Sequence, residues 1–88
     1  MAWTASFDPR AFKELEKLDR IVQRRMVKFL QDRVLRRDDP RNLGKAMAGD
    51  KAGLWRYRVG DYRLICQIND QAESIRVLRV SHRKEAYR

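Results

Sequence analysis

Three arginines in the second half of the chain give the strongest chemical signal. Arg56 and Arg58 stand two residues apart in an alternating segment, and Arg63 follows just after Gly60-Asp61. Side chains two residues apart on a strand point to the same face of a sheet. Guanidinium groups offer a rigid fork of donors that matches phosphate oxygens, whereas packing gives no reason to line a sheet face with them. The pattern therefore predicts a phosphate-binding surface.

The end of the chain carries side chains that can complete such a site, in the order His82, Arg83, Lys84, Glu85, Ala86, Tyr87, Arg88. Cleavage of RNA through its own 2′-hydroxyl needs a base, an acid for the 5′-oxygen, and cations for the charge on phosphorus. Arginine suits only the last task, because it stays protonated. His82 and Tyr87 are the candidates for proton transfer, with Lys84 behind them. Lys84 and Arg88 also add positive charge for binding RNA.

Plainer roles fit the same residues. A solvated sheet face would explain the pair Arg56 and Arg58. A surface position after the last strand would explain His82, and packing of its ring on the sheet would explain Tyr87. Both sets of roles stay open at the level of sequence.

The composition favours an anionic partner for a single domain over residues 1–88. Lys and Arg number 21 against 12 Asp and Glu, a formal net charge of +9. Nucleic acid is the first expectation, an acidic protein the second and a membrane surface the third. The single cysteine and single histidine argue against a disulfide and a zinc site, and no cofactor is expected. The sequence shows neither a membrane-length apolar run nor a secretory leader, so a cytoplasmic protein is expected.

Two helices are expected in the first half of the chain. Asp8 followed by Pro9 marks the start of the first helix, as N-cap and first helical residue. The apolar stripe of this helix should face the core and consists of Phe12, Leu15 and Leu18. A second helix is expected over about residues 21–36, followed by a segment over 38–53 that is mostly loop.

Four strands are expected, over about residues 3–7, 54–59, 62–68 and 74–80. Gly60-Asp61 predicts a two-residue hairpin turn. Alternation assigns Trp55 and Tyr57 to the core, and Cys66 should be a small buried hydrophobe. The order β-α-α-β-β-β predicts an α+β domain, with two N-terminal helices packed on a largely antiparallel four-stranded sheet.

Several motifs resemble those of a known family. They are Leu43-Gly44-Lys45, Trp55-Arg56-Tyr57-Arg58, Gly60-Asp61-Tyr62-Arg63-Leu64, and Val80-Ser81-His82-Arg83 with Tyr87-Arg88. With them the chain resembles the RelE/ParE superfamily of bacterial type II toxins, and within it the RelE branch. The resemblance implies a RelE-like fold. It also implies a metal-independent endoribonuclease that cleaves mRNA in the ribosomal A site and inhibits translation.

By position, the site residues that the resemblance implies are Arg56, Arg58, Arg63, Arg83 and Tyr87. Tyr87 would stack on the base next to the cut, while Arg63 and Arg83 would hold the scissile phosphate. Arg83 would also assist the leaving group. The best-studied members carry Lys at the positions of Arg56 and Arg58, and Lys exchanges a proton far more readily than Arg. We therefore hypothesise that His82 or Tyr87 takes part in proton transfer.

The resemblance also implies partners. These are a cognate RelB-like antitoxin, mRNA and the ribosome, with operator DNA contacted through the antitoxin. Two other classes of function remain open: a ParE-like inhibitor of DNA gyrase, and an RNA- or ribosome-binding module that does not cleave. The ParE side of the superfamily lacks this set of arginines and tail tyrosine, which favours the RelE expectation.

Overall fold

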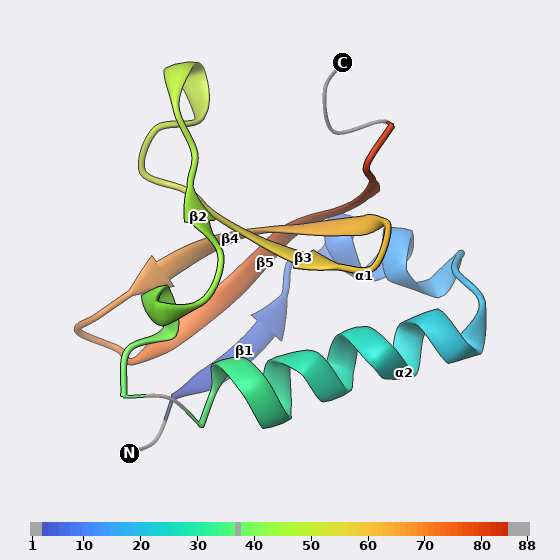
Figure 1. Ribbon diagram of the computed structural model, residues 1–88, viewed down its shortest axis with the longest axis horizontal. Coiled ribbons are helices and arrows are strands. Elements are labelled where there is room, and N and C mark those ends of the chain that lie inside the picture. Colours follow the sequence, from blue (N-terminus) through green and yellow to red (C-terminus); the bar gives the residue numbers. More distant parts are fainter. Residues whose placement is uncertain (1–2, 37, 85–88) are drawn as a thin grey trace.

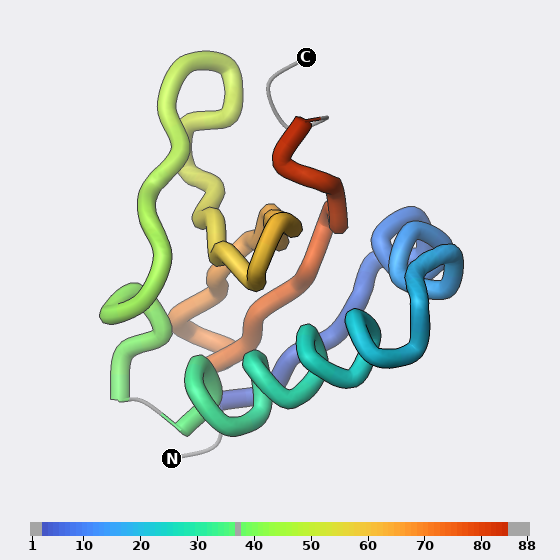
Figure 2. Tube along the Cα trace, turned by 45° about the vertical axis from the view of Figure 1, so that its right-hand side comes forward, coloured from blue at the N-terminus to red at the C-terminus, as the bar shows by residue number. Residues whose placement is uncertain are grey.

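The computed structural model describes residues 3–36 and 38–84, which form an α+β fold. Its elements are β1 (Thr4–Phe7), α1 (Pro9–Glu16), α2 (Arg20–Phe29), η1 (Leu30–Val34), η2 (Pro40–Asn42), β2 (Lys45–Ala46), η3 (Gly49–Lys51), β3 (Trp55–Val59), β4 (Tyr62–Asn69) and β5 (Ser74–His82). The two main helices, α1 and α2, lie on one side of the sheet (Figure 1). The segment between β2 and β3 and the end of β5 rise on the side away from α2 (Figure 2).

Each main helix begins at an aspartate. Asp8 accepts a hydrogen bond from the backbone N–H of Arg10, 3.3 Å long, and Asp19 accepts one from Ile21, 2.9 Å long. Pro9 follows Asp8 in the first turn, where its missing N–H costs no hydrogen bond. The predicted start of the first helix is confirmed. The second helix continues from α2 into η1, a π-helical turn, and so spans most of its expected length.

The sheet has five strands in the order β1-β5-β4-β3-β2. β1 runs parallel to β5, and the other pairs are antiparallel. The hairpin turn at Gly60-Asp61 is confirmed, because Val59 pairs with Tyr62 across it. The expectation of four strands was wrong. The additional strand is β2, whose two residues, Lys45 and Ala46, fell within the expected loop. So short a segment has no apolar alternation that would reveal a strand.

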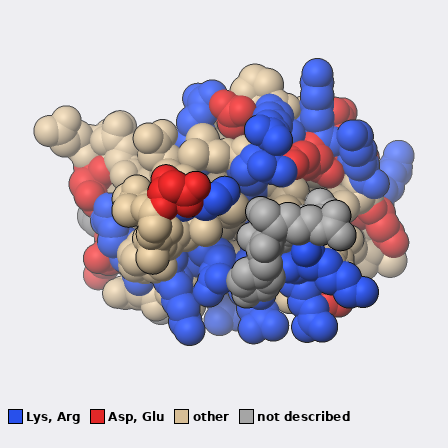
Figure 3. Space-filling view, turned by 90° about the horizontal axis from the view of Figure 1, so that it is seen from above, with Lys and Arg blue, Asp and Glu red and all other residues tan. Residues whose placement is uncertain are grey.

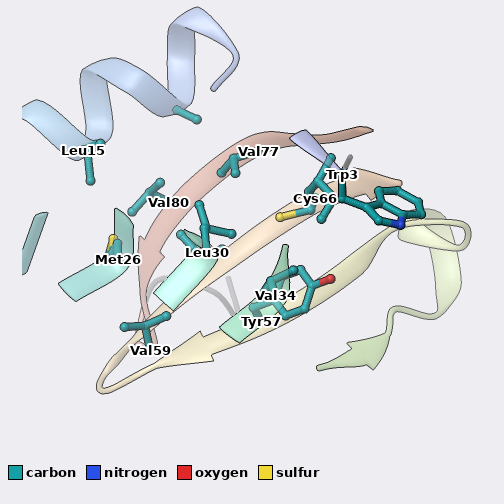
Figure 4. Close-up of a cluster of buried hydrophobic side chains, with 13 residues drawn as sticks. Trp3, Leu15, Met26, Leu30, Val34, Tyr57, Val59, Cys66, Val77 and Val80 are labelled. Atoms are coloured by element: carbon teal, nitrogen blue, oxygen red, sulfur yellow. The ribbon is translucent and has the colours of Figure 1, made fainter. Parts of the chain in front are cut away.

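The core lies between the sheet and the helices, where side chains from both meet in one cluster (Figure 4). Tyr57 and Cys66 are fully buried, as expected. Burial raises the pKa of the Cys66 thiol to about 12. The expectation for Phe12 was wrong, since its side chain is 50% exposed while Ala11 and Leu15 are buried. Ala11 and Leu15 are four residues apart and share the helix face that packs inward, which turns Phe12 to the side.

Two hydrogen bonds fix the segment before β2 against β3. The Tyr57 hydroxyl donates to the carbonyl of Pro40 over 2.7 Å, and the Trp55 indole N–H donates to the carbonyl of Leu43 over 2.6 Å. Both donors belong to β3, and both acceptors belong to the segment before β2, one in η2 and one just after it. These bonds satisfy polar groups that would otherwise be buried without partners.

Gly44 allows this segment to approach β3 closely. Its φ of +79° lies in the left-handed region, which side chains other than glycine adopt at a cost. A Cβ at this position would collide with the carbonyl oxygen of Arg56 and lie 2.8 Å from the Trp55 indole nitrogen. Glycine is therefore required for β2 to pair with the strand that carries Arg56.

Replacing Gly44 by Ala is expected to lower the free energy of unfolding by about 2 to 4 kcal/mol, because backbone strain and overpacking add. Urea denaturation would measure the loss. Gly49→Ala is the matched control, since Gly49 also has a positive φ, +69°, but nothing lies within 4 Å of its Cβ position. It should lose only about 1 kcal/mol. Equal losses in the two variants would show that the close approach at Gly44 does not affect the free energy of unfolding.

Candidate functional site

The strand register gathers cations on the sheet face that points away from the core. Arg58 lies directly opposite Arg63, and Arg56 lies opposite Ile65. Across the next pair of strands, Lys45 lies opposite Arg56. Directly paired residues of antiparallel strands point to the same side. The three arginines and Lys45 therefore share this face, which we call the outer face. The prediction that Arg56 and Arg58 point to the same side is confirmed.

These cations line a hollow of about 450 Å³ that we call the arginine hollow. Side chains from α2, η1, β2, β3 and β4 contribute to its lining, among them Phe29, Arg33, Lys45, Arg56, Arg58 and Arg63. Arg33 stands over the Phe29 ring, 6.0 Å from its centroid. Arg33 and Lys45 were not among the site residues predicted from the sequence. Their charge was visible, but only the tertiary fold brings them to the hollow.

The described ion pairs lie away from Arg56 and Arg58. They join Arg41 to Asp39 and Asp70, Arg76 to Asp8, and Arg79 to Glu14. Within residues 3–36 and 38–84, no salt bridge involves Arg56 or Arg58. The hydrogen bond from Arg76 holds the pKa of Asp8 below its usual value, and that from Arg41 does the same for Asp70.

Electrostatic repulsion on the outer face favours a bound anion. Arg58 and Arg63 face each other across β3 and β4, and Arg63 is only 6% exposed. Like charges directly opposite on a sheet are destabilising. Seen from above, Lys and Arg side chains occupy much of the molecular surface (Figure 3). A phosphate group in the arginine hollow would offset this positive charge and accept hydrogen bonds from guanidinium groups.

The backbone of Arg83 lies beside the β3–β4 hairpin. Its backbone N–H donates to the carbonyl of Asp61 over 2.7 Å. Two residues earlier, Ser81 lies directly opposite Arg63. The backbone therefore brings Arg83 to the same end of the sheet as Arg58 and Arg63, and its side chain is exposed. Lys84 follows it and is also exposed. The predicted site residues Tyr87 and Arg88 lie outside the described residues.

His82 lies on the opposite side of the sheet from the arginines. It pairs with Tyr62, and the two rings meet edge to face with centroids 5.2 Å apart. Tyr62 in turn pairs with Val59, which belongs to the core. His82 Nδ1 accepts a hydrogen bond from the backbone N–H of Lys84, 3.2 Å long. The structure does not bring the His82 ring into the arginine hollow, and its part in proton transfer stays a prediction.

A β-bulge explains the side on which His82 lies. Ile65 pairs with Arg79 but Cys66 pairs with Val77, so Leu78 is an additional residue in β5. An additional residue reverses the alternation of faces beyond it. Simple alternation from the buried Val77 would have placed His82 on the outer face with the arginines. The bulge is not visible in the sequence.

No three His, Cys, Asp or Glu side chains gather closely enough to hold a metal ion anywhere in the described chain. The helices of this part of the chain also lack the combination of length and apolar character needed to cross a membrane. These findings do not test the reaction itself, so cleavage without a metal ion stays a prediction.

Removing one of the opposed cations should stabilise the fold. Arg58→Gln is expected to raise the free energy of unfolding by about 0.2 to 1 kcal/mol at low ionic strength, because it relieves repulsion with Arg63. Added salt should shrink the gain by screening. Lys51→Gln is the control, since it removes one charge from exposed η3. Urea denaturation at two salt concentrations measures both variants. A gain no larger than that of the control would contradict the repulsion.

Comparison with known proteins places the chain in a family. The family model described as "ParE toxin of type II toxin-antitoxin system, parDE" matches residues 5–87. The chain is similar to Toxin RelG of Mycobacterium tuberculosis, with 33% identity over 88 residues that cover 100% of this chain and 99% of the relative.

Solved structures agree with this placement. In the toxin–antitoxin complex RelBE2 of Mycobacterium tuberculosis, one chain matches with a TM-score of 0.85 and 30% identity, over 93% of this chain and 99% of that one. In the intact RelBE complex of E. coli, a chain matches with a TM-score of 0.71 and 25% identity, over 92% and 96% of the two chains. The family model alone does not separate the RelE and ParE branches, but these relatives are Rel proteins. The chain therefore belongs to the RelE/ParE superfamily of type II toxins, on its RelE branch.

Proposed function

We propose that this RelE-branch toxin is a ribosome-dependent endoribonuclease that cuts mRNA in the A site and so inhibits translation. The observation that carries the proposal is the arginine hollow, where Arg56, Arg58 and Arg63 share one sheet face. Strands hold these cations in place before a ligand arrives, which is the condition for strong electrostatic stabilisation of a transition state. The formal net charge of +9 would also draw the protein to RNA.

The proposed reaction uses the 2′-hydroxyl of the RNA as nucleophile. The 2′-oxygen forms a bond to phosphorus while the bond from phosphorus to the 5′-oxygen breaks. The products are a 2′,3′-cyclic phosphate and a 5′-hydroxyl. In this proposal Arg63 and Arg83 hold the scissile phosphate, and Arg56 and Arg58 hold its neighbours. Tyr87 stacks on the adjacent base.

The proposed protein partner is a RelB-like antitoxin. The two solved structures described above are toxin–antitoxin complexes, and this chain carries a surface suited to a similar contact. Phe12 is 50% exposed and Ile21 is 66% exposed on the helices, beside several basic side chains. An antitoxin segment with apolar and acidic residues would complement both features. Operator DNA would then be contacted through the antitoxin, and action on ribosomes places the toxin in the cytoplasm.

Inhibition of DNA gyrase is the second candidate function. The observation that favours it is the description of the matching family model, which names ParE. The arginine hollow favours cleavage of RNA instead, because it gathers guanidinium donors for several phosphates on one sheet face.

Induction of the toxin in cells, followed by mapping of 5′ ends on a test mRNA, distinguishes these functions. Cuts inside translated codons are expected. Arg83→Ala should reduce them about 10²- to 10³-fold, the usual loss when a group that stabilises the transition state is removed. The control is Arg24→Ala, which removes an exposed charge from α2. Intact message with DNA breaks would favour the gyrase function. Intact message with normal growth would contradict the proposed toxin activity.

A further inference from the structure

The arginine hollow contains an ammonium group that the sequence analysis did not assign. Lys45 lies on β2 directly opposite Arg56, and it lines the same hollow as Arg58 and Arg63. Opposed residues of an antiparallel pair have Cβ atoms about 5 Å apart. The flexible side chain of Lys45 is exposed, so it can reach a ligand seated among the arginines.

Lys45 differs from the other cations of the hollow in what it can do chemically. The remaining charged side chains of the described lining are Arg33, Arg56, Arg58 and Arg63. A guanidinium group binds phosphate well but scarcely exchanges its proton, whereas a lysine ammonium group can give a proton up. Among the described residues of the hollow, Lys45 is therefore the proton donor best suited to catalysis.

The strand order places Lys45 across the sheet from the tail. The order β5-β4-β3-β2 sets Arg63, on β4, between β5 and the edge strand that carries Lys45. Arg83 follows β5 directly. In an in-line displacement at phosphorus, the attacking and leaving oxygens lie on opposite sides of the phosphorus atom. A proton donor for the leaving oxygen must then approach from one side of the phosphorus atom, and Lys45 on the edge strand lies to one side of Arg63.

The backbone of Lys45 is held by its neighbours. Gly44 brings the chain against β3 where no side chain would fit, and the Trp55 indole donates to the carbonyl of Leu43. Lys45 then pairs with Arg56 in the sheet. The residue is thus fixed at its Cα on the sheet edge, which limits the positions that its ammonium group reaches.

We propose that Lys45 is a catalytic residue that donates a proton to the departing 5′-oxygen. As the bond between phosphorus and the 5′-oxygen breaks, a proton passes from Lys45 Nζ to that oxygen, giving the 5′-hydroxyl. The proton of the 2′-hydroxyl passes to solvent water. Lys45 regains its proton from solvent, so no other reactant is consumed. This inference rests on the proposed nuclease function.

The test compares Lys45→Arg with the unchanged toxin in single-turnover cleavage of a short mRNA on programmed ribosomes. Arginine preserves the positive charge but is a poor proton donor. The variant should keep its affinity for the ribosome–mRNA complex and cleave about 10²- to 10⁴-fold more slowly, the range for loss of a general acid. Cleavage at the unchanged rate would overturn the proposal.

A modified substrate separates proton donation from positioning. When sulfur replaces the 5′-oxygen at the scissile bond, the leaving thiolate is stable and needs no proton. Lys45→Arg should then cleave at nearly the rate of the unchanged toxin, while Arg63→Ala, which removes phosphate binding, should stay slow on both substrates. A Lys45→Arg variant that is equally impaired on both substrates would show that Lys45 positions the RNA and donates no proton.

Controls distinguish failure of this inference from failure of the proposed function. Lys51→Arg makes the same substitution in exposed η3, outside the arginine hollow, and should cleave normally. Absence of cleavage by the unchanged toxin would contradict the nuclease function itself. Cleavage by the unchanged toxin together with normal cleavage by Lys45→Arg would contradict the role of Lys45 alone.

Discussion

The register between β3 and β4 is the constraint on which the rest of the structure depends. The turn at Gly60-Asp61 sets Arg58 opposite Arg63. At the next position along the two strands, Tyr57 lies opposite Leu64. Since side chains alternate between faces, a slip of one residue in the register would move the arginines to the core face and the buried side chains to the outer face. It would bury guanidinium groups in an apolar core, which is costly. The buried Tyr57, bonded to the Pro40 carbonyl, therefore fixes where the arginines point.

Charge is arranged unevenly over the outer face. Arg76 and Arg79 are paired with carboxylates of the first helix and its cap, whereas Arg56 and Arg58 belong to no described salt bridge. Paired charges lower the local field, and clustered like charges raise it. The arginine hollow thus gathers like charges on one sheet face, a conflict with the local rules of stability that is common at functional sites. Burial of large apolar side chains, worth about 1.5 to 3 kcal/mol each, outweighs repulsion of this size.

The sequence allowed much of the fold and the centre of the site to be predicted. The Asp8 helix start, the Gly60-Asp61 turn and the shared face of Arg56 and Arg58 all follow from short-range rules, and the structure confirms them. What could not be predicted depends on contacts between distant segments. Lys45 joins the arginines because the two-residue β2 pairs with β3, and such a strand has no periodicity to detect. His82 turns away because of the bulge at Leu78, which changes the register between β4 and β5.

Titration of the protein with a trinucleotide that cannot be cleaved, because its 2′-oxygens are methylated, tests the central claim most directly. Nuclear magnetic resonance would follow the side-chain Nε–H signals of the individual arginines. If the arginine hollow binds the RNA backbone, the signals of Arg56, Arg58 and Arg63 should shift saturably, and added salt should weaken the binding. The ion-paired Arg76 and Arg79 serve as internal references and should stay in place. Shifts at these references, with none at the hollow, would contradict the account.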